Sequence, residues 1–380
     1  MATITSYTKK NGQKAWQFQT YLGVDEITGK QRYTTRRGFA TKKECTLALN
    51  KLLLEIEEHG FIQNKIMTFE QLYKDWLPKY RNKVKPSTVA ATITVFDLYI
   101  LPHFKKMRLD KITVAYCQKV LDGWYEEYRG YKGFKMKLNL VLDYAVSLEL
   151  IATNPMKKTQ TPRQKEKDKP VNFYTKQQLQ EFLSLYESEG DQMKYVFFHL
   201  LAYTGLRKSE ALALQYSDIN FLKHELTVGR TVAVNEDSEI IIQSPKTKNS
   251  YRTINLDPVT MQLLQEWQRE QREWYFKLGF NTNKKDQLIF SNNQNKAIRP
   301  SLVNGWLRNF YNRHEDMQKI TAHGFRFTHC SLLFEAGASM KEVQGRLGHK
   351  DVQTTMNIYA KVTPKMATNT GEKFALFMAN

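Results

Sequence analysis

Six residues in the second half of the chain have side chains that can grip a phosphate group and attack its phosphorus. They are Arg207, Lys246, His323, Arg326, His349 and Tyr359. A guanidinium forms paired, charge-assisted hydrogen bonds to phosphate oxygens that a lysine ammonium does not reproduce. An imidazole can bond the same group or move a proton, and a tyrosine hydroxyl can act as a nucleophile. The set therefore predicts a phosphate-binding pocket that contains a nucleophile.

The two arginines are expected to bind the two non-bridging oxygens of the phosphate. Arg207 lies in TGLRKSE, where Gly205 is expected to end one apolar helix before a second begins. A five-coordinate phosphorus carries extra negative charge on these oxygens, and each pre-positioned donor contributes about 3–4 kcal/mol. Glu210, three residues after Arg207, is expected to support the residues of the pocket without binding the phosphate itself. A surface arginine at a helix start is the alternative interpretation of GLR alone.

The two histidines are expected to lie at helix ends. His323 and Arg326 in HGFR are three residues apart, so they share a helix face, and Thr321 is placed to cap that helix. A helix N-terminus favours an anion. His349 follows Gly348, the expected C-terminal glycine of a helix that a capping box opens. Both imidazoles are expected to bond the phosphate, and His323 also to move the tyrosine proton. A surface pair and a satisfied interior histidine are the alternatives.

Tyr359 and Lys246 are the expected nucleophile and general acid. A phenol with a pKa of about 10 is only roughly one part in a thousand ionised at pH 7, so Tyr359 needs a base or a polarising neighbour. A packed aromatic is the alternative, since the chain has 20 tyrosines. Lys246 lies in a polar turn between two predicted strands, where a hairpin tip would let it reach the leaving oxygen. Lys248 is a competing candidate.

The motifs TGLRKSE, SPKTKNS, HGFR, LGH and MNIYAKV, in this order, resemble the active site of the tyrosine recombinases, the phage-integrase family. The resemblance covers about residues 65–365. It implies an enzyme that cuts and rejoins DNA through a 3′-phosphotyrosyl intermediate, without metal, ATP or another cofactor. Such an integrase integrates or excises a phage genome or other mobile element. Phe327 departs from the family, in which many members have a second histidine after the arginine.

Two other functions are compatible with parts of this pattern. One is a sequence-specific DNA-binding regulator that does not cut, although such a protein has no use for Tyr359. The other is a resolvase of the same family, since the pocket chemistry is shared. A metal nuclease is disfavoured because the sequence contains no HExxH and no clustered carboxylates.

Charge and composition agree with a nucleic-acid partner. Lys and Arg number 57 against 38 Asp and Glu, which gives a net charge of +19 and a pI near 9.5. Such a balance favours a polyanion. The three cysteines form no CxxC pair, and we find no signal core and no apolar run of about 18 residues. We expect a protein of the bacterial cytoplasm, associated with the nucleoid and not with a membrane.

The predicted fold is mainly α with small β elements (α+β) in three domains. Residues 1–62 combine strands with one helix and resemble the arm-binding domain of some phage and transposon integrases. Residues 66–156 form a helical core-binding bundle, residues 157–170 a charged linker, and residues 171–380 a catalytic domain with a tail. In this last domain the expected strands are Leu226–Val234, Glu239–Gln243 and Tyr251–Asn255.

Basic residues outside the pocket are expected to contact DNA, with a solvated surface as the alternative for each. They are Lys14, Arg32, Arg36, Arg37, Lys83, Lys85, Lys135 and Lys248. The resemblance also implies core and arm attachment sites in double-stranded DNA, self-association to a dimer or tetramer on DNA, and possible help from an excisionase and a host DNA-bending protein. The apolar segment Phe374–Met378 is expected to dock on a neighbouring protomer.

Overall fold

The computed structural model describes residues 2–9, 11–24, 31–59, 67–163, 171–245 and 250–348, with the single positions 353, 356 and 378. The chain divides into two compact units, residues 1–79 with 95–162 and residues 80–94 with 163–380. The predicted three-domain boundaries stay predictions. The expected mainly α fold with small sheets is confirmed, since 54% of the described residues are helical.

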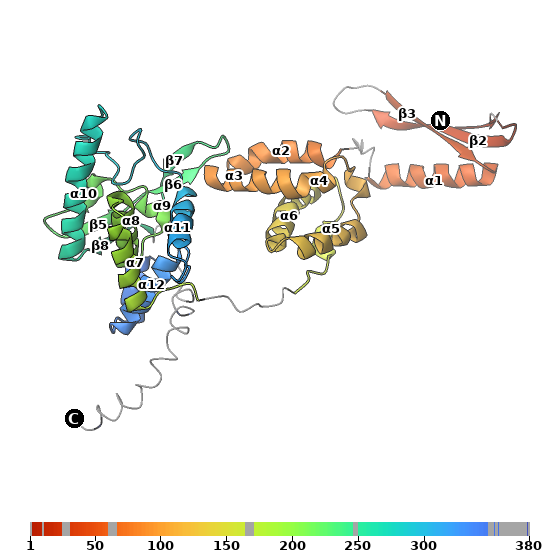
Figure 1. The fold of residues 1–380 in the computed structure, drawn as a ribbon. Helices are drawn as coiled ribbons and strands as arrows, with labels where there is room; N and C mark the ends of the chain where they lie inside the picture. Colours follow the sequence, from red (N-terminus) through yellow and green to blue (C-terminus); the bar gives the residue numbers. More distant parts are fainter. Residues whose placement is uncertain are drawn as a thin grey trace. The chain divides into compact units, whose positions relative to one another are not determined.

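A small antiparallel sheet opens the chain, and one helix covers one of its faces (Figure 1). Its elements are β1 (Thr3–Thr8), β2 (Lys14–Val24), β3 (Gln31–Phe39) and α1 (Lys42–His59). Phe18 of β2 packs with Cys45 and Leu49 of α1 in a buried core. The Thr41 hydroxyl accepts a hydrogen bond from Glu44 N at 3.2 Å, as expected for a helix cap. The Glu44 carboxylate in turn accepts a hydrogen bond from Ala40 N at 3.2 Å, which further fixes the start of α1.

A group of helices and helical turns follows. They are α2 (Phe69–Arg81), α3 (Pro86–Val95), η1 (Phe96–Ile100), α4 (Leu101–Phe104), η2 (Leu109–Lys111), α5 (Val114–Glu127), α6 (Tyr131–Ser147) and η3 (Pro155–Lys158). Buried aromatic rings form much of the core: Tyr73 stacks on Phe96 at 4.4 Å, and Trp124 meets Phe134 at 5.7 Å. The π-helical turn η1 lies just before Pro102, whose missing N–H and bulky ring disturb a regular α-helical turn.

The helical stretch Pro86–Phe104 is, among the described residues, long and apolar enough to cross a membrane by length and composition alone. The expectation that no such apolar run exists is therefore wrong. Core helices pass the same test, and Phe96, Ile100 and Phe104 of this stretch are fully buried. Burial accounts for part of the apolar composition, since 28% of this window is buried inside the structure.

The second unit packs helices around α8, whose side chains are buried on most sides. Besides α3, its helical elements are α7 (Lys176–Ser188), α8 (Gln192–Thr204), α9 (Lys208–Ala211), η4 (Tyr216–Asp218), α10 (Pro258–Lys277), α11 (Leu302–Arg313), α12 (Gly324–Glu335) and α13 (Met340–Leu347). Helix α8 contacts α7, α10 and α12 (Figure 1). This burial explains why α8 reads as a continuous apolar run rather than as an amphipathic stripe.

The strands of this unit form two sheets. They are β4 (Ile219–Asn220), β5 (Glu225–Val228), β6 (Thr231–Val234), β7 (Ile240–Gln243) and β8 (Arg252–Asn255). The sheets have the orders β4-β5-β8 and β6-β7. The predicted strand Leu226–Val234 is therefore two strands, and the predicted hairpin between residues 239–243 and 251–255 is wrong. Strand β5 pairs with β8 instead, which buries Leu226 opposite Ile254 in the core.

Candidate active site

Arg207 lies at the junction of two helices, as the sequence predicts. Gly205 ends α8 in the left-handed region with φ 66°, and Arg207 occupies the N-cap position of α9. The Arg207 side chain donates from Nη1 to Glu210 Oε1 at 2.7 Å, and its backbone N donates to Oε2 at 3.1 Å. The side chain keeps 40% of its surface exposed. It is thus oriented by a buried carboxylate and still accessible to a ligand.

Glu210 is a buried carboxylate held by two arginines. Only 3% of the residue is exposed, and Arg252 Nη2 donates to Glu210 Oε2 at 2.8 Å. Burial raises the pKa of Glu210, but the charges and hydrogen bonds of Arg252 and Arg207 outweigh it, so the net pKa lies below its ordinary value. Glu210 therefore stays ionised and orients both guanidiniums.

His323 and Arg326 lie at the start of α12. The Thr321 hydroxyl accepts a hydrogen bond from Gly324 N at 3.2 Å, so it closes the turn that leads into α12, whose N-cap position is His323. Arg326 is 1% exposed and donates from Nη1 to Gly205 O at 2.7 Å and from Nη2 to Leu347 O at 2.6 Å. Its guanidinium is held between two segments that are distant in sequence.

The charges of these residues act on one another, which identifies one site. Burial, followed by the charges of Arg207 and Arg252, lowers the pKa of Arg326 to about 9. Lost hydration around the ring, followed by the charges of Arg326 and Arg207, lowers the pKa of His323. The Glu210 carboxylate bonds the guanidiniums of Arg207 and Arg252, and its charge also acts on Arg326 near the positive end of α12. The cluster is therefore electrostatically suited to an anion.

Three residues of this cluster were not predicted as site residues. They are Arg252, which donates to Glu210 Oε2 and to Arg346 O, Arg346 itself, and His329, whose Nε2 accepts a hydrogen bond from Arg346 Nε. His329 lies three residues after Arg326, the spacing that places two side chains on one helix face, so the sequence did contain a signal for it. Arg252 and Arg346 carry no comparable local signal.

Four predicted residues, Lys246, Lys248, His349 and Tyr359, lie outside the described residues, as does the segment Phe374–Met378 apart from Met378 itself. The described structure reaches Pro245 before the first two. Before His349, α13 begins with the expected capping box and ends at Gly348 in the left-handed region. The described strands on either side of Lys246, β7 and β8, belong to different sheets and do not pair with each other as the expected hairpin requires.

The predicted DNA contacts of the N-terminal sheet lie on different faces. Arg36 pairs with Phe18, and cross-strand partners share a face, so Arg36 lies on the α1 side. Lys14 lies on this side as well, with Nζ 5.7 Å from the Trp16 ring centroid. Arg37 pairs with Gln17 on the opposite, open face. Arg32 lies within β3.

The remaining predicted contacts are less uniform than the sequence suggests. Lys83 is exposed after α2, and Lys85 is partly buried just before α3. Lys135 of α6 donates to Thr159 O at 3.2 Å and to Thr161 Oγ1 at 2.7 Å, and burial lowers its pKa. Lys135 thus stabilises the segment after η3, in addition to any contact with a phosphate.

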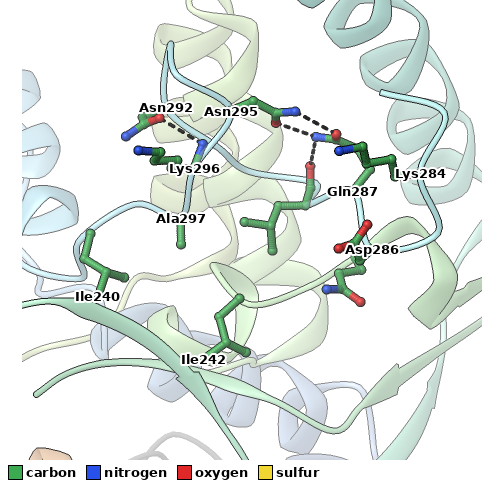
Figure 2. A pocket seen from close by; sticks show the side chains of 11 residues that line it. Ile240, Ile242, Lys284, Asp286, Gln287, Asn292, Asn295, Lys296 and Ala297 are labelled. Carbon is green, nitrogen blue, oxygen red and sulfur yellow. Dashed lines mark hydrogen bonds between the residues drawn. The ribbon is translucent and has the colours of Figure 1, made fainter. Parts of the chain in front are cut away.

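A separate pocket of about 570 Å³ lies between β7 and the loop before α11. Figure 2 shows Ile240 and Ile242 of β7 on one side and the amides of Gln287, Asn292 and Asn295 on the other. Gln287 and Asn295 exchange hydrogen bonds of 2.8 and 3.0 Å, which fixes the loop. None of the clustered arginines lines this pocket. Among the described residues, no group of acidic, histidine or cysteine side chains is arranged to hold a metal ion.

Comparisons with known proteins agree with the site and the fold. Residues 172–366 match the phage integrase family, residues 68–125 the phage integrase N-terminal SAM-like domain, and residues 4–56 an arm DNA-binding domain. The chain belongs to the phage integrase family. It is a tyrosine-type site-specific recombinase of a mobile element, as the resemblance implied.

Several proteins are similar along most of their length. The ICEBs1 integrase of Bacillus subtilis is 28% identical over 96% of this chain and 97% of its own length. The Tn1549 transposon integrase, solved with transposon right end DNA, has a TM-score of 0.66 at 22% identity and covers 81% of this chain and all of that one. Lambda integrase, solved as a dimer on a core site, has a TM-score of 0.58 at 15% identity and covers 93% of each chain. A lambda integrase tetramer bound to a Holliday junction has a TM-score of 0.54 at 15% identity, with 93% and 94% coverage.

Proposed function

We propose that Arg207, His323 and Arg326 bind the scissile phosphate of DNA, and that Tyr359 attacks its phosphorus. The observation that carries this proposal is the hydrogen bond from Arg326 Nη1 to Gly205 O at 2.7 Å, which holds Arg326 beside the segment that contains Arg207, although the two arginines are far apart in sequence. Two like charges are held near each other with one shared carboxylate, an arrangement that an anionic ligand stabilises. The exposed part of Arg207 and the exposed His323 give a phosphate access to the cluster.

In the proposed reaction, the Tyr359 oxygen forms a bond to phosphorus as the bond to the 5′ oxygen breaks. The tyrosine proton passes to His323, and the leaving 5′ oxygen takes a proton from Lys246. The product is a 3′-phosphotyrosine and a free 5′ hydroxyl. Attack of a 5′ hydroxyl from another strand reverses these steps and rejoins the DNA. The number and kind of phosphoester bonds do not change, so the exchange needs no ATP.

The lowered pKa of His323 supports its role as the proton acceptor. An imidazole with a depressed pKa is neutral at pH 7 and has an available lone pair. When the phosphate binds, its negative charge offsets Arg207 and Arg326, which raises the pKa of His323 toward its ordinary value. The bound state therefore favours proton uptake by His323 at the moment when the tyrosine loses its proton.

The proposed partners are core and arm attachment sites in double-stranded DNA. The net charge of +19 and the matched arm DNA-binding region support both. On the open face of the N-terminal sheet, the side chains of Gln17, Gln19 and Arg37 are of types that read base edges. Lys14 and Arg36, on the other face, suit phosphates.

We further propose that four protomers act together on two DNA sites, in the bacterial cytoplasm at the nucleoid. The fold shared with lambda integrase, known as a dimer on a core site and as a tetramer on a Holliday junction, supports this assembly. The C-terminal segment Phe374–Met378 would dock on a neighbouring protomer. An excisionase and a host DNA-bending protein would set the direction of the reaction.

A nicked attachment-site duplex tests the proposed chemistry. The nick lets the short 5′ fragment diffuse away, so the covalent intermediate accumulates and is seen as a slow band on a denaturing gel. We expect an adduct with the wild-type chain in EDTA, and none with Tyr359→Phe. An adduct that persists in Tyr359→Phe, or that requires a divalent metal, would overturn the proposal.

A further inference from the structure

Arg326 depends on two backbone carbonyls for its orientation. Its Nη1 donates to Gly205 O and its Nη2 to Leu347 O, at 2.7 and 2.6 Å. The first carbonyl ends α8 and the second ends α13, so each belongs to a separate segment. Because the guanidinium is planar and rigid, a change in the separation of these carbonyls turns or shifts it.

His329 and Arg346 join these two segments directly. Arg346 Nε donates to His329 Nε2 at 3.0 Å, and His329 Nδ1 bonds to Ala202 O at 2.8 Å. Arg346 Nη2 also donates to Tyr203 O at 3.1 Å. Ala202 and Tyr203 precede Gly205 in α8, and Arg346 precedes Leu347. The pair therefore bridges the ends of α8 and α13 immediately beside the carbonyls that hold Arg326.

The partners of His329 define its protonation state. A carbonyl oxygen only accepts, so Nδ1 carries the proton, and a guanidinium only donates, so Nε2 presents its lone pair. Burial, and then the charge of Arg346, lowers the pKa of His329 to about 3. The imidazole is thus a neutral bridge with one donor and one acceptor in fixed directions.

Packing leaves these segments little room to move. A Cβ atom added at Gly205 would lie 2.5 Å from Leu347 Cδ2 and 2.8 Å from His329 Cδ2. The end of α8, the end of α13 and the His329 ring are therefore in close contact. Such contacts resist small shifts because protein interiors are close-packed.

We propose that His329 and Arg346 are a positioning pair that sets the separation of the Gly205 and Leu347 carbonyls and so aims Arg326 at the scissile phosphate. This inference rests on the proposed function of Arg326. Neither side chain needs to touch DNA. Their effect is carried by two carbonyls to one guanidinium, and a misplacement of about 1 Å in such a group can cost about 100-fold in rate.

The experiment measures single-turnover cleavage of the nicked attachment-site duplex at saturating protein. The variants are His329→Phe, which keeps a ring but no hydrogen bonds, His329→Gln, which restores one donor and one acceptor, and Arg346→Lys. We expect DNA affinity within about threefold of wild type for all three. Cleavage should fall about 10- to 100-fold for His329→Phe and Arg346→Lys, with partial recovery in His329→Gln.

A second substrate separates positioning from general loss of structure. It carries a methylphosphonate at the cut site, in which a methyl group replaces one charged non-bridging oxygen. A guanidinium then has less negative charge to stabilise at the cut site. A variant that acts through Arg326 should therefore be slower than the wild type by only about threefold or less on this substrate. The same should hold for Arg326→Lys. Combining His329→Phe with Arg326→Lys should be little slower than Arg326→Lys alone.

His199→Phe is the matched control. His199 is also buried, and burial lowers its pKa to about 4, but it bonds Thr260 and stacks on the Tyr203 ring rather than bonding Arg346 or a carbonyl that holds Arg326. The His199→Phe variant should have a lower melting temperature. Its cleavage rate relative to the wild type should be the same on both substrates. Equal defects on both substrates, or wild-type rates for His329→Phe and Arg346→Lys, would overturn the positioning pair. A wild-type rate for Arg326→Lys would instead overturn the proposed function.

Discussion

The buried carboxylate of Glu210 accepts a hydrogen bond from the buried guanidinium of Arg252 at 2.8 Å. Arg252 also donates from Nε to Arg346 O at 3.0 Å. One side chain therefore connects β8, the Arg207–Glu210 pair and the end of α13 that leads to His349. The anion site is thus built on a buried network of charges, and each member orients the next.

Glu210→Gln should destabilise the second unit strongly. The change removes the negative charge that pairs with the guanidiniums of Arg207 and Arg252, and the loss of one partner of a buried pair costs about 3–5 kcal/mol. Urea unfolding at pH 7 measures the effect. Glu70→Gln is the control: it removes an exposed ion pair with Lys74, which water screens, so the unfolding midpoint should stay in place. Equal, small effects in both variants would contradict the role of Glu210.

Gly205→Ala should cost more stability than Gly190→Ala. Both glycines have left-handed φ values, 66° and 74°, so alanine is strained at either position. At Gly205 the new methyl group also collides with Leu347 and His329, whereas at Gly190 it meets nothing within 4 Å. We expect about 1 kcal/mol for Gly190→Ala and about 2–4 kcal/mol for Gly205→Ala. Thermal unfolding of the two variants measures the difference, which should be accompanied by slow cleavage only in Gly205→Ala.

Stability should fall on mild acidification because of two buried histidines. The pKa values of His329 and His199 are lowered to about 3 and about 4. Below the ordinary histidine pKa of about 6.5, these histidines are protonated in the unfolded chain but stay neutral in the folded chain, so stability decreases as the pH falls. From pH 7 to pH 5 each histidine should remove about 2 kcal/mol. In the His329→Phe and His199→Phe variants, the free energy of unfolding should fall by about 2 kcal/mol less between pH 7 and pH 5 than in the wild type. Urea unfolding at several pH values measures this loss. A loss equal to that of the wild type would contradict the assignment.

Arg37→Ala and Arg36→Ala should affect arm-site binding in different ways. Arg37 shares the open face of the sheet with Gln17, so its loss should cost about 1–3 kcal/mol on the arm sequence and less on random DNA. Arg36 lies on the α1 side. Its loss should weaken binding to the arm sequence and to random DNA by the same factor, and reduce the slope of log affinity against log salt concentration by about one. Fluorescence anisotropy with the two duplexes at several salt concentrations separates these outcomes, and identical behaviour of the two variants would contradict the assignment of faces.

DNA affinity should depend steeply on salt. If about eight phosphates are neutralised, the affinity should fall by a few powers of ten between 50 and 200 mM salt. The same anisotropy titration on a full attachment site measures it. A flat response would contradict an electrostatic DNA surface.

The sequence alone determined the features that depend on near neighbours. The helix end at Gly205, the turn closed by Thr321 and the capping box before α13 follow from side-chain and backbone preferences within about four residues. The types and order of Arg207, His323 and Arg326 similarly predicted a phosphate clamp, and the family match agrees with it.

Only the tertiary structure decided which distant residues meet. The alternating segment around Leu226 is compatible with several partner strands, and burial of Leu226 against Ile254 selected β8 over the nearer β7. No local rule links Arg252 to Glu210 or Arg346 to His329, because these contacts depend on how the ends of α8, β8 and α13 converge. The sequence therefore identifies the residues that can grip a phosphate, whereas the packed interior decides how the guanidiniums are oriented to do so.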